Sequence, residues 1–251
     1  MMMRKTWMAG LALVAMTGLL MGQAKVSKKE FDAYNAIMAA TTPDAQIEAV
    51  DKFVTGFADS KLKGVALFIA ANAAERKGDV PKAIVYAQSS LDADPKNFQA
   101  MILIAGELSR GTRENDLDKE EKLTRADKLA NEAIETVKVA PKPNDKLTDE
   151  QWGAYQKDFA SQAHEDLGMS ALARKKYDAA INEFKMAVDM AANPNPSTMI
   201  RLAGAYDSAG KPDDALAVLA KVFATPGLDP NVKAFADREK AVADKLKAAK
   251  K

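Results

Sequence analysis

The stretch HEDLGMSALARKKYDAAINEFKMAV, residues 164–188, predicts two helices joined by a tight turn. Ala180, Phe184 and Ala187 follow the spacing of residues that share one face of a helix. Small side chains at Gly168 and Ala180 would let two helix axes approach closely, while larger neighbours fill the space on either side. We therefore expect a helical hairpin with close contacts at these two positions.

Two other parts of the chain repeat this turn. Gly78 and Gly210 suit the end of a helix, where the backbone adopts a left-handed conformation. Pro81 and Pro212 suit the first turn of the next helix, where the missing amide donor costs nothing. The three turns lie within 75–97, 173–188 and 207–223. In one register they give a period near 34 residues, which predicts stacked helix-turn-helix units.

This register resembles the tetratricopeptide repeat family, whose signature runs large residue, Leu-Gly, Tyr, Ala, aromatic, Ala and Pro. The fullest match is at 161–194, where Leu167, Gly168, Tyr177, Ala180, Phe184 and Ala187 are on pattern. The register divides the chain into approximate repeats at 30–63, 64–97, 98–140, 146–194 and 196–229. A charged insertion separates the two helices expected in the third.

The resemblance implies an all-α, right-handed α-solenoid over residues 25–251, with a C-terminal capping helix at 231–249. One hairpin cannot bury its apolar face alone, so successive hairpins stack and build a continuous core. Thr148 and Gln151 predict a capping box at the start of a long helix from about Asp149 to Ala173. Its early aromatic residues are either packing or a local binding surface, and we favour packing.

The first 24 residues read as a signal peptide. Arg4 and Lys5 precede an uncharged, mostly apolar run from Trp7 to Met21, and small residues suit cleavage after Ala24. The run is shorter than the roughly 20 residues that cross a bilayer comfortably, so a retained anchor is the less favoured alternative. We expect an exported protein, periplasmic or secreted, with no stable membrane span after cleavage.

The amino-acid composition excludes several kinds of functional site. The chain has no cysteine, so disulfides and thiolate metal sites are excluded. Without residues 1–24 it has 34 basic and 35 acidic residues, and this balance gives no general electrostatic reason to bind nucleic acid. We therefore expect a protein or peptide partner and no nucleic acid.

His164 is the only histidine, and it precedes Glu165. A zinc-peptidase motif needs a second histidine on the same helical face, so this motif fails. In the repeat register His164 takes the position of a large packing residue, which favours a partly buried histidine bonded within a helix interface. We expect no catalytic residue, metal or cofactor; the alternatives are an envelope hydrolase or metal-dependent enzyme using His164.

Binding is expected along the first helix of each repeat, which lines the concave groove in proteins that this chain resembles. The candidate groove residues are Phe68, Asn72, Gln99, Ile102, Gln162, Glu165, Met169, Ile200 and Asp207. Several of them could instead pack between repeats. The family's carboxylate clamp is not reproduced, because Phe68 stands where that clamp has a lysine, although Asn72 matches an asparagine position. We expect a non-enzymatic interaction module of a bacterial cell envelope; the other alternative is a structural subunit of a larger envelope complex.

Overall fold

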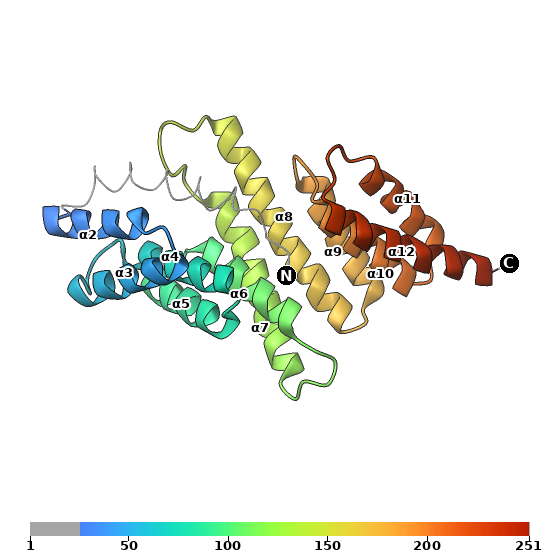
Figure 1. The fold of residues 1–251 in the computed structure, drawn as a ribbon, viewed down its shortest axis with the longest axis horizontal. Coiled ribbons are helices and arrows are strands. Elements are labelled where there is room, and N and C mark those ends of the chain that lie inside the picture. The colour runs from blue at the N-terminus through green and yellow to red at the C-terminus, as the bar shows by residue number, and fades with distance from the viewer. Residues whose placement is uncertain (1–25, 251) are drawn as a thin grey trace. The chain divides into compact units, whose positions relative to one another are not determined.

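The computed structural model describes residues 26–250 and contains eleven helices and no strand within that range (Figure 1). The expected signal peptide, residues 1–24, lies outside the described residues. The chain divides into two compact units. The N-terminal unit comprises the described residues through Glu107 together with Glu135–Gly153, and the C-terminal unit comprises Leu108–Ile134 and the described residues from Ala154. The predicted all-α fold is confirmed.

The N-terminal unit is built from consecutive antiparallel helices, each packed on the next. Helix α2 packs on α3, α3 on α4 and α4 on α5. The bounds are α2 Lys28–Ala39, α3 Pro43–Gly56, α4 Lys63–Lys77, α5 Val80–Ala93 and, reaching beyond the unit at its end, α6 Phe98–Gly111. The pairs α2–α3 and α4–α5 each form a helical hairpin.

Alanine allows α4 and α5 to approach closely. Ala70 and Ala74 of α4 and Ala83 and Ala87 of α5 are all fully buried. The serine hydroxyl of Ser90 donates a hydrogen bond of 2.7 Å to the carbonyl of Gly64, so the buried polar group has a partner. Small side chains therefore set the helix spacing, as the sequence predicted.

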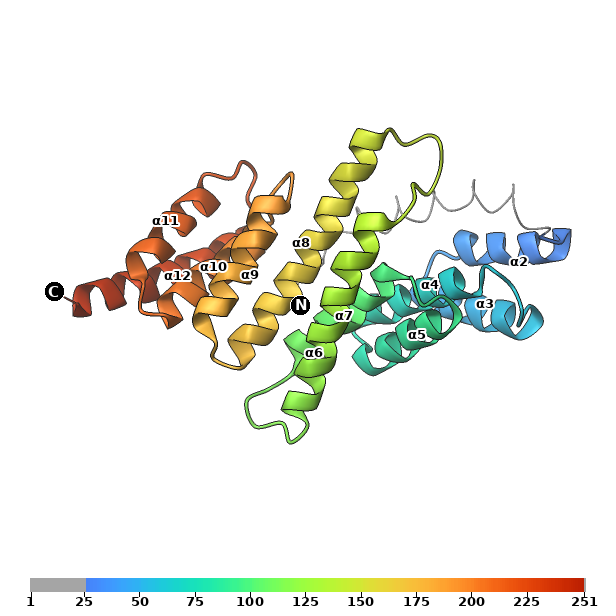
Figure 2. The same ribbon diagram turned by 180° about the vertical axis from the view of Figure 1, so that it is seen from behind.

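The C-terminal unit continues the same pattern (Figure 2). Helix α10 packs on α9, α11 and α12, and α11 also packs on α12. The bounds are α7 Lys119–Val139 and α8 Asp149–Ala173, both of which begin or end in the other unit, then α9 Tyr177–Met190, α10 Pro196–Ser208, α11 Pro212–Phe223 and α12 Pro230–Ala249. The long helix at 149–173 and a final helix within one residue of 231–249 are confirmed.

Side-chain caps begin two of the helices. The Thr42 hydroxyl accepts a hydrogen bond of 3.2 Å from the Ala45 amide, and Pro43 occupies the first turn of α3. The Thr148 hydroxyl accepts from the Gln151 amide at 3.1 Å, and the Gln151 side chain accepts from the Thr148 amide at 2.9 Å. This reciprocal pair is the predicted capping box.

The α8–α9 hairpin has the predicted close contact. A β-carbon on Gly168 would lie 2.7 Å from the Phe184 ring, and Ala180 and Phe184 are completely buried. A side chain at Gly168 would therefore displace a ring that has no free space around it.

The three repeat turns share one backbone conformation. Gly78 has φ 75° and Gly210 has φ 72°, as the turn requires. Lys175, which occupies the equivalent position in the α8–α9 turn, has φ 59°. A residue with a β-carbon thus adopts a conformation that the other two turns give to glycine.

Candidate functional site

Helix α4, the first helix of the second repeat, keeps one line of partly accessible side chains. Every residue from Gly64 to Ala74 is buried except three, and Glu75 extends the same line. The α4 stripe consists of the half-buried residues Val65, Phe68, Asn72 and Glu75. Their spacing of three, four and three residues places them on one face of the helix. The stripe therefore combines apolar and polar side chains on a helix that is otherwise packed.

The two predicted residues on α4 lie one turn apart. The Asn72 side-chain amide donates a hydrogen bond of 3.0 Å to the carbonyl of Phe68. This bond uses one of the two amide hydrogens and leaves the side-chain oxygen as an acceptor. On α6, Gln99 is half-buried, whereas Ile102 is only 5% exposed. Ile102 packs in the core and presents almost no surface to a partner.

Glu165 in the C-terminal unit joins two helices. Its carboxylate accepts hydrogen bonds of 2.6 Å from the Thr198 hydroxyl and 2.6 Å from the Arg201 guanidinium, both on α10. Burial would penalise an unpaired carboxylate, and these two donors satisfy it. Glu165 thus connects α8 to α10 in this structure, and its 8% exposure leaves it little surface for a groove ligand.

Three other candidates in this unit remain partly accessible. Gln162, Met169 and Ile200 are all half-buried. Met169 packs beside the core cluster that contains Ala180, and Ile200 packs beside the cluster that contains Leu219. Each residue therefore contributes to packing with one part of its side chain and leaves another part exposed.

Asp207 lies beneath the last helix. It is 6% exposed, and the Glu239 carboxyl of α12 lies within hydrogen-bonding reach of it. Burial, reinforced by the charge of Glu239, raises the pKa of Asp207 to about 7. The repeat register placed Asp207 on the groove face of α10, but α12 covers that position. Asp207 is therefore an interface residue rather than an exposed binding residue in this structure.

His164 has the predicted packing environment. Its side chain is 12% exposed, and its Nδ1 lies 2.8 Å from a carboxylate oxygen of Glu183 on α9. This contact connects the two helices of the hairpin. Within residues 26–250, no three or more histidine, cysteine, aspartate or glutamate side chains form a group that could hold a metal ion.

Arg174 is a connecting residue that sequence analysis missed. Its guanidinium donates to Glu120 at 2.8 Å and Asp127 at 3.0 Å on α7, and to the Ser170 hydroxyl at 2.6 Å. The hydrogen bond from Arg174 holds the pKa of Glu120 below its usual value. One arginine thus ties the end of α8 to the first part of α7, which begins within the charged insertion at 110–125. Arg174 lies 47 to 54 residues from Asp127 and Glu120 in the sequence, and no sequence pattern predicted that they would pair.

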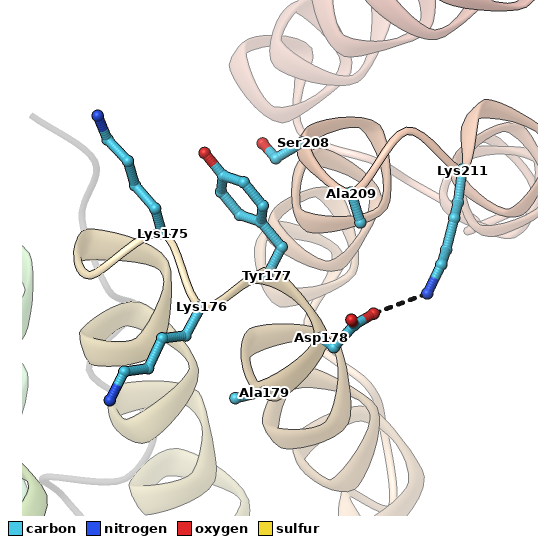
Figure 3. A pocket seen from close by; sticks show the side chains of 8 residues that line it. All are labelled: Lys175, Lys176, Tyr177, Asp178, Ala179, Ser208, Ala209 and Lys211. Carbon is cyan, nitrogen blue, oxygen red and sulfur yellow. Dashed lines mark hydrogen bonds and ion pairs between the residues drawn. The ribbon is translucent and has the colours of Figure 1, made fainter.

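A shallow pocket of about 490 Å³ lies between the α8–α9 and α10–α11 turns (Figure 3). The residues that line it are Lys175, Lys176, Tyr177, Asp178, Ala179, Ser208, Ala209 and Lys211. Lys211 forms an ion pair of 2.8 Å with Asp178, and Lys175 pairs with Glu114. Two of its three lysines thus already have carboxylate partners, and we assign no ligand to this pocket.

Comparisons with known proteins agree with the repeat pattern. Residues 171–238 match the family model described as tetratricopeptide repeat. This part of the chain is therefore a tetratricopeptide repeat region. The match covers α9, α10, α11 and part of α12, together with the end of α8. A comparison with curated proteins gives no significant match.

The fold of the wider chain is also that of tetratricopeptide repeat proteins. A tetratricopeptide repeat protein of Thermus thermophilus, TTC0263, superposes with a TM-score of 0.57 at 17% identity, covering 84% of this chain and 98% of that one. MamA from Desulfovibrio magneticus RS-1 gives a TM-score of 0.59 at 13% identity, covering 79% and 95%. These identities support the fold alone.

The tetratricopeptide fold generally mediates protein–protein interaction. No helix in residues 26–250 has both the length and the apolar character needed to cross a membrane.

Proposed function

We propose that this protein is a non-enzymatic interaction module of a bacterial cell envelope. It holds a peptide or protein segment against exposed faces of its first helices. The observation that carries the proposal is the α4 stripe, because between Gly64 and Glu75 the helix is buried except along this line of side chains.

The chemistry of the stripe favours a segment with an apolar anchor. Phe68 supplies a large apolar surface, and Asn72, one turn away, supplies an amide that can bond to a peptide backbone. A lysine that could pair with a C-terminal carboxylate is absent from the Phe68 position. An extended or helical peptide with an apolar side chain suits this surface better than a chain terminus does.

Gln162, Met169 and Ile200 form a second set of the same character in the C-terminal unit. Met169 has a flexible, polarizable side chain that can adapt to different partner shapes. Glutamine adds a hydrogen-bonding group beside these apolar side chains. The two sets therefore favour the same kind of partner: a protein segment that combines apolar side chains with an accessible backbone.

Partner capture from an envelope extract tests the binding surface. Phe68→Glu and Met169→Glu each place a charge on a half-buried apolar position, and both should reduce recovery of the partner at least several-fold. Val85→Glu is the matched control, because Val85 is an apolar residue of α5 that is 62% exposed. Circular dichroism checks that all variants remain helical. Equal recovery of the partner by the wild type and all three variants would show that the first-helix surfaces do not bind it.

Export is proposed from the sequence pattern of residues 1–24. Cell fractionation followed by N-terminal sequencing of the mature protein should find it outside the cytoplasm and beginning at Lys25. Recovery of the complete chain from the cytoplasm would contradict the envelope assignment and leave the interaction proposal to be decided by the capture experiment.

A further inference from the structure

Two carboxyl groups meet where the capping helix α12 packs on α10. Asp207 is 6% exposed, and neither of its oxygens receives a hydrogen bond. Glu239 reaches across from α12 and lies over Gly204, where a β-carbon would be 3.2 Å from its Oε1 atom. The absence of a side chain at Gly204 gives the glutamate its place beside Asp207.

Among the described residues, no cation compensates Asp207. Glu239 is the only charged group there that acts appreciably on its carboxyl. Four basic residues around α10 have other partners: Arg201 pairs with Glu165, Lys211 with Asp178 and Lys247 with Asp213, and Lys250 donates to the carbonyl of Gly210. The charged or titratable residues of the packed elements, besides Asp207 itself, are Asp149, Glu150, Tyr155, Lys157, Asp158, His164, Glu165 and Asp166 on α8; Tyr177, Asp178, Glu183, Lys185 and Asp189 on α9; Arg201 and Tyr206 on α10; Asp213, Asp214 and Lys221 on α11; and Lys233, Asp237, Arg238, Glu239, Lys240, Asp244, Lys245 and Lys247 on α12, with Lys250 directly after it.

Two ionised carboxylates in this position would repel each other, and Asp207 would have no donor. One shared proton removes the repulsion and supplies the missing hydrogen bond, because a protonated carboxyl donates to an ionised one. The burial of Asp207 and the neighbouring Glu239 raise the pKa of Asp207 to about 7, so the proton is held far above the ordinary range of an aspartate.

We infer that Asp207 and Glu239 hold α12 firmly on α10 only while they share a proton, so that the capping helix becomes pH-sensitive. The protonated pair favours the docked helix. When the proton leaves, two like charges face each other between α10 and α12, and the docked state loses stability. Undocking would expose the apolar face formed by Val232, Ala236 and Ala243 of α12. This regulation goes beyond the proposed binding function and does not depend on it.

The direction of the pH dependence follows from the pKa of Asp207 in the docked and the undocked state. When α12 leaves, Asp207 returns to an ordinary pKa near 3.8, whereas docking holds it at about 7. Between these values the docked state binds more protons than the undocked state. The docking equilibrium therefore weakens as the pH rises from about 4 to about 7, and it changes little above that range.

Hydrogen exchange of the intact protein at pH 5, 6, 7 and 8 tests this directly. After correction for the intrinsic exchange rate, protection of α12 amides should fall by about ten- to a hundredfold between pH 5 and pH 8. Protection of α4 and α5 should stay constant. Asp207→Asn should abolish the fall, because the amide can donate to Glu239 at every pH. Asp237→Asn, on an exposed residue of α12, is the matched control and should keep the wild-type fall.

Glu239→Gln removes the pair from the other helix and should also flatten the profile, so the test does not depend on the folding of one variant. A constant wild-type profile, or an unchanged fall in both pair variants, would overturn the inference. Restoration of protection at pH 8 by millimolar Mg²⁺ or Ca²⁺ in the wild type but not in Asp207→Asn would also overturn it, because the pair would then be a cation site.

Discussion

Lys175 shows how one residue can store strain in a repeat turn. Its φ of 59° places it in the left-handed region, which costs an L-residue with a β-carbon on the order of 1 kcal/mol. The equivalent turns have glycine at Gly78 and Gly210, and the same hydrogen-bonding pattern closes all three turns. The lysine side chain pairs with Glu114, but both groups are exposed, so the pair compensates little.

Lys175→Gly should therefore raise the free energy of unfolding by up to about 1 kcal/mol, because glycine adopts this conformation without the β-carbon penalty. Chemical denaturation of the two variants Lys175→Gly and Lys175→Ala separates backbone strain from the ion pair. Both variants lose the pair with Glu114, but only glycine relieves the backbone. If alanine and glycine were equally stable at this position, the strain argument would be wrong.

Replacing Gly168 should have the opposite effect and lower the stability of the protein. Gly168→Ala would place a β-carbon 2.7 Å from the fully buried Phe184 ring, so the hairpin must separate or the ring must move, at a cost of about 1–3 kcal/mol. Gly153→Ala is the matched control, because nothing lies within 4 Å of the added carbon. Thermal unfolding should show a lower midpoint for Gly168→Ala only, and an unchanged midpoint would mean that the helices are not in close contact there.

At the scale of the elements, the repeat turns and hairpins could be predicted from the sequence because they depend on local chemistry. Gly78, Gly210, Pro81 and Pro212 each suit only a few backbone positions, and small residues recur at helical spacing. Lys175 could have been recognised only by its distance of five residues from Ala180, which matches the distance from Gly78 to Ala83 and from Gly210 to Ala215.

The candidate site was harder to predict than the helices. Repeat register gives the face of a helix on which a residue lies, but not what covers that face. Glu165 is bonded to Thr198 and Arg201, and Asp207 is covered by Glu239. Both depend on partners 32 to 36 residues away, and no local pattern specifies such a pairing. Phe68 and Asn72 stay accessible, and their role in binding remains a prediction.

The link between α8 and α10 is testable at this scale. Arg201→Met would leave the Glu165 carboxylate buried with Thr198 as its remaining donor, which should cost about 1–3 kcal/mol. Adding Glu165→Gln removes the uncompensated charge, so the double variant should lose less than the sum of the two single variants. Denaturant titrations of the wild type, the two single variants and the double variant complete this double-mutant cycle. Strictly additive losses of stability would show that the pair does not couple the helices.

The carboxyl pair between α10 and α12 predicts how stability depends on pH. Since the folded-state pKa of Asp207 lies near 7 and its unfolded value near 3.8, stability from this group is lost as the pH rises through that window. The stability of Asp207→Asn relative to the wild type should therefore rise by about 2 kcal/mol between pH 5 and pH 8. Urea midpoints at both values measure this, and a relative stability that does not rise would contradict the assigned sign.

At the scale of the whole molecule, the chain is an all-helical repeat protein whose two units are built from the same kind of hairpin. No disulfide contributes to its stability, since the sequence contains no cysteine. Most apolar side chains of the first helices are used in that packing. A narrow set of accessible residues is left for recognition: the α4 stripe in the N-terminal unit, and Gln162, Met169 and Ile200 in the C-terminal unit.

Site-specific photocrosslinking tests this central claim most directly. A photoreactive phenylalanine analogue replaces Phe68 on the α4 stripe or, as the control, Val85 on the exposed face of α5, and the protein is irradiated in the envelope extract. The account predicts a discrete crosslinked partner from position 68 and none from position 85. Crosslinking of the same partner from position 85 and not from position 68 would contradict it, because the partner would then bind the second helix of the repeat.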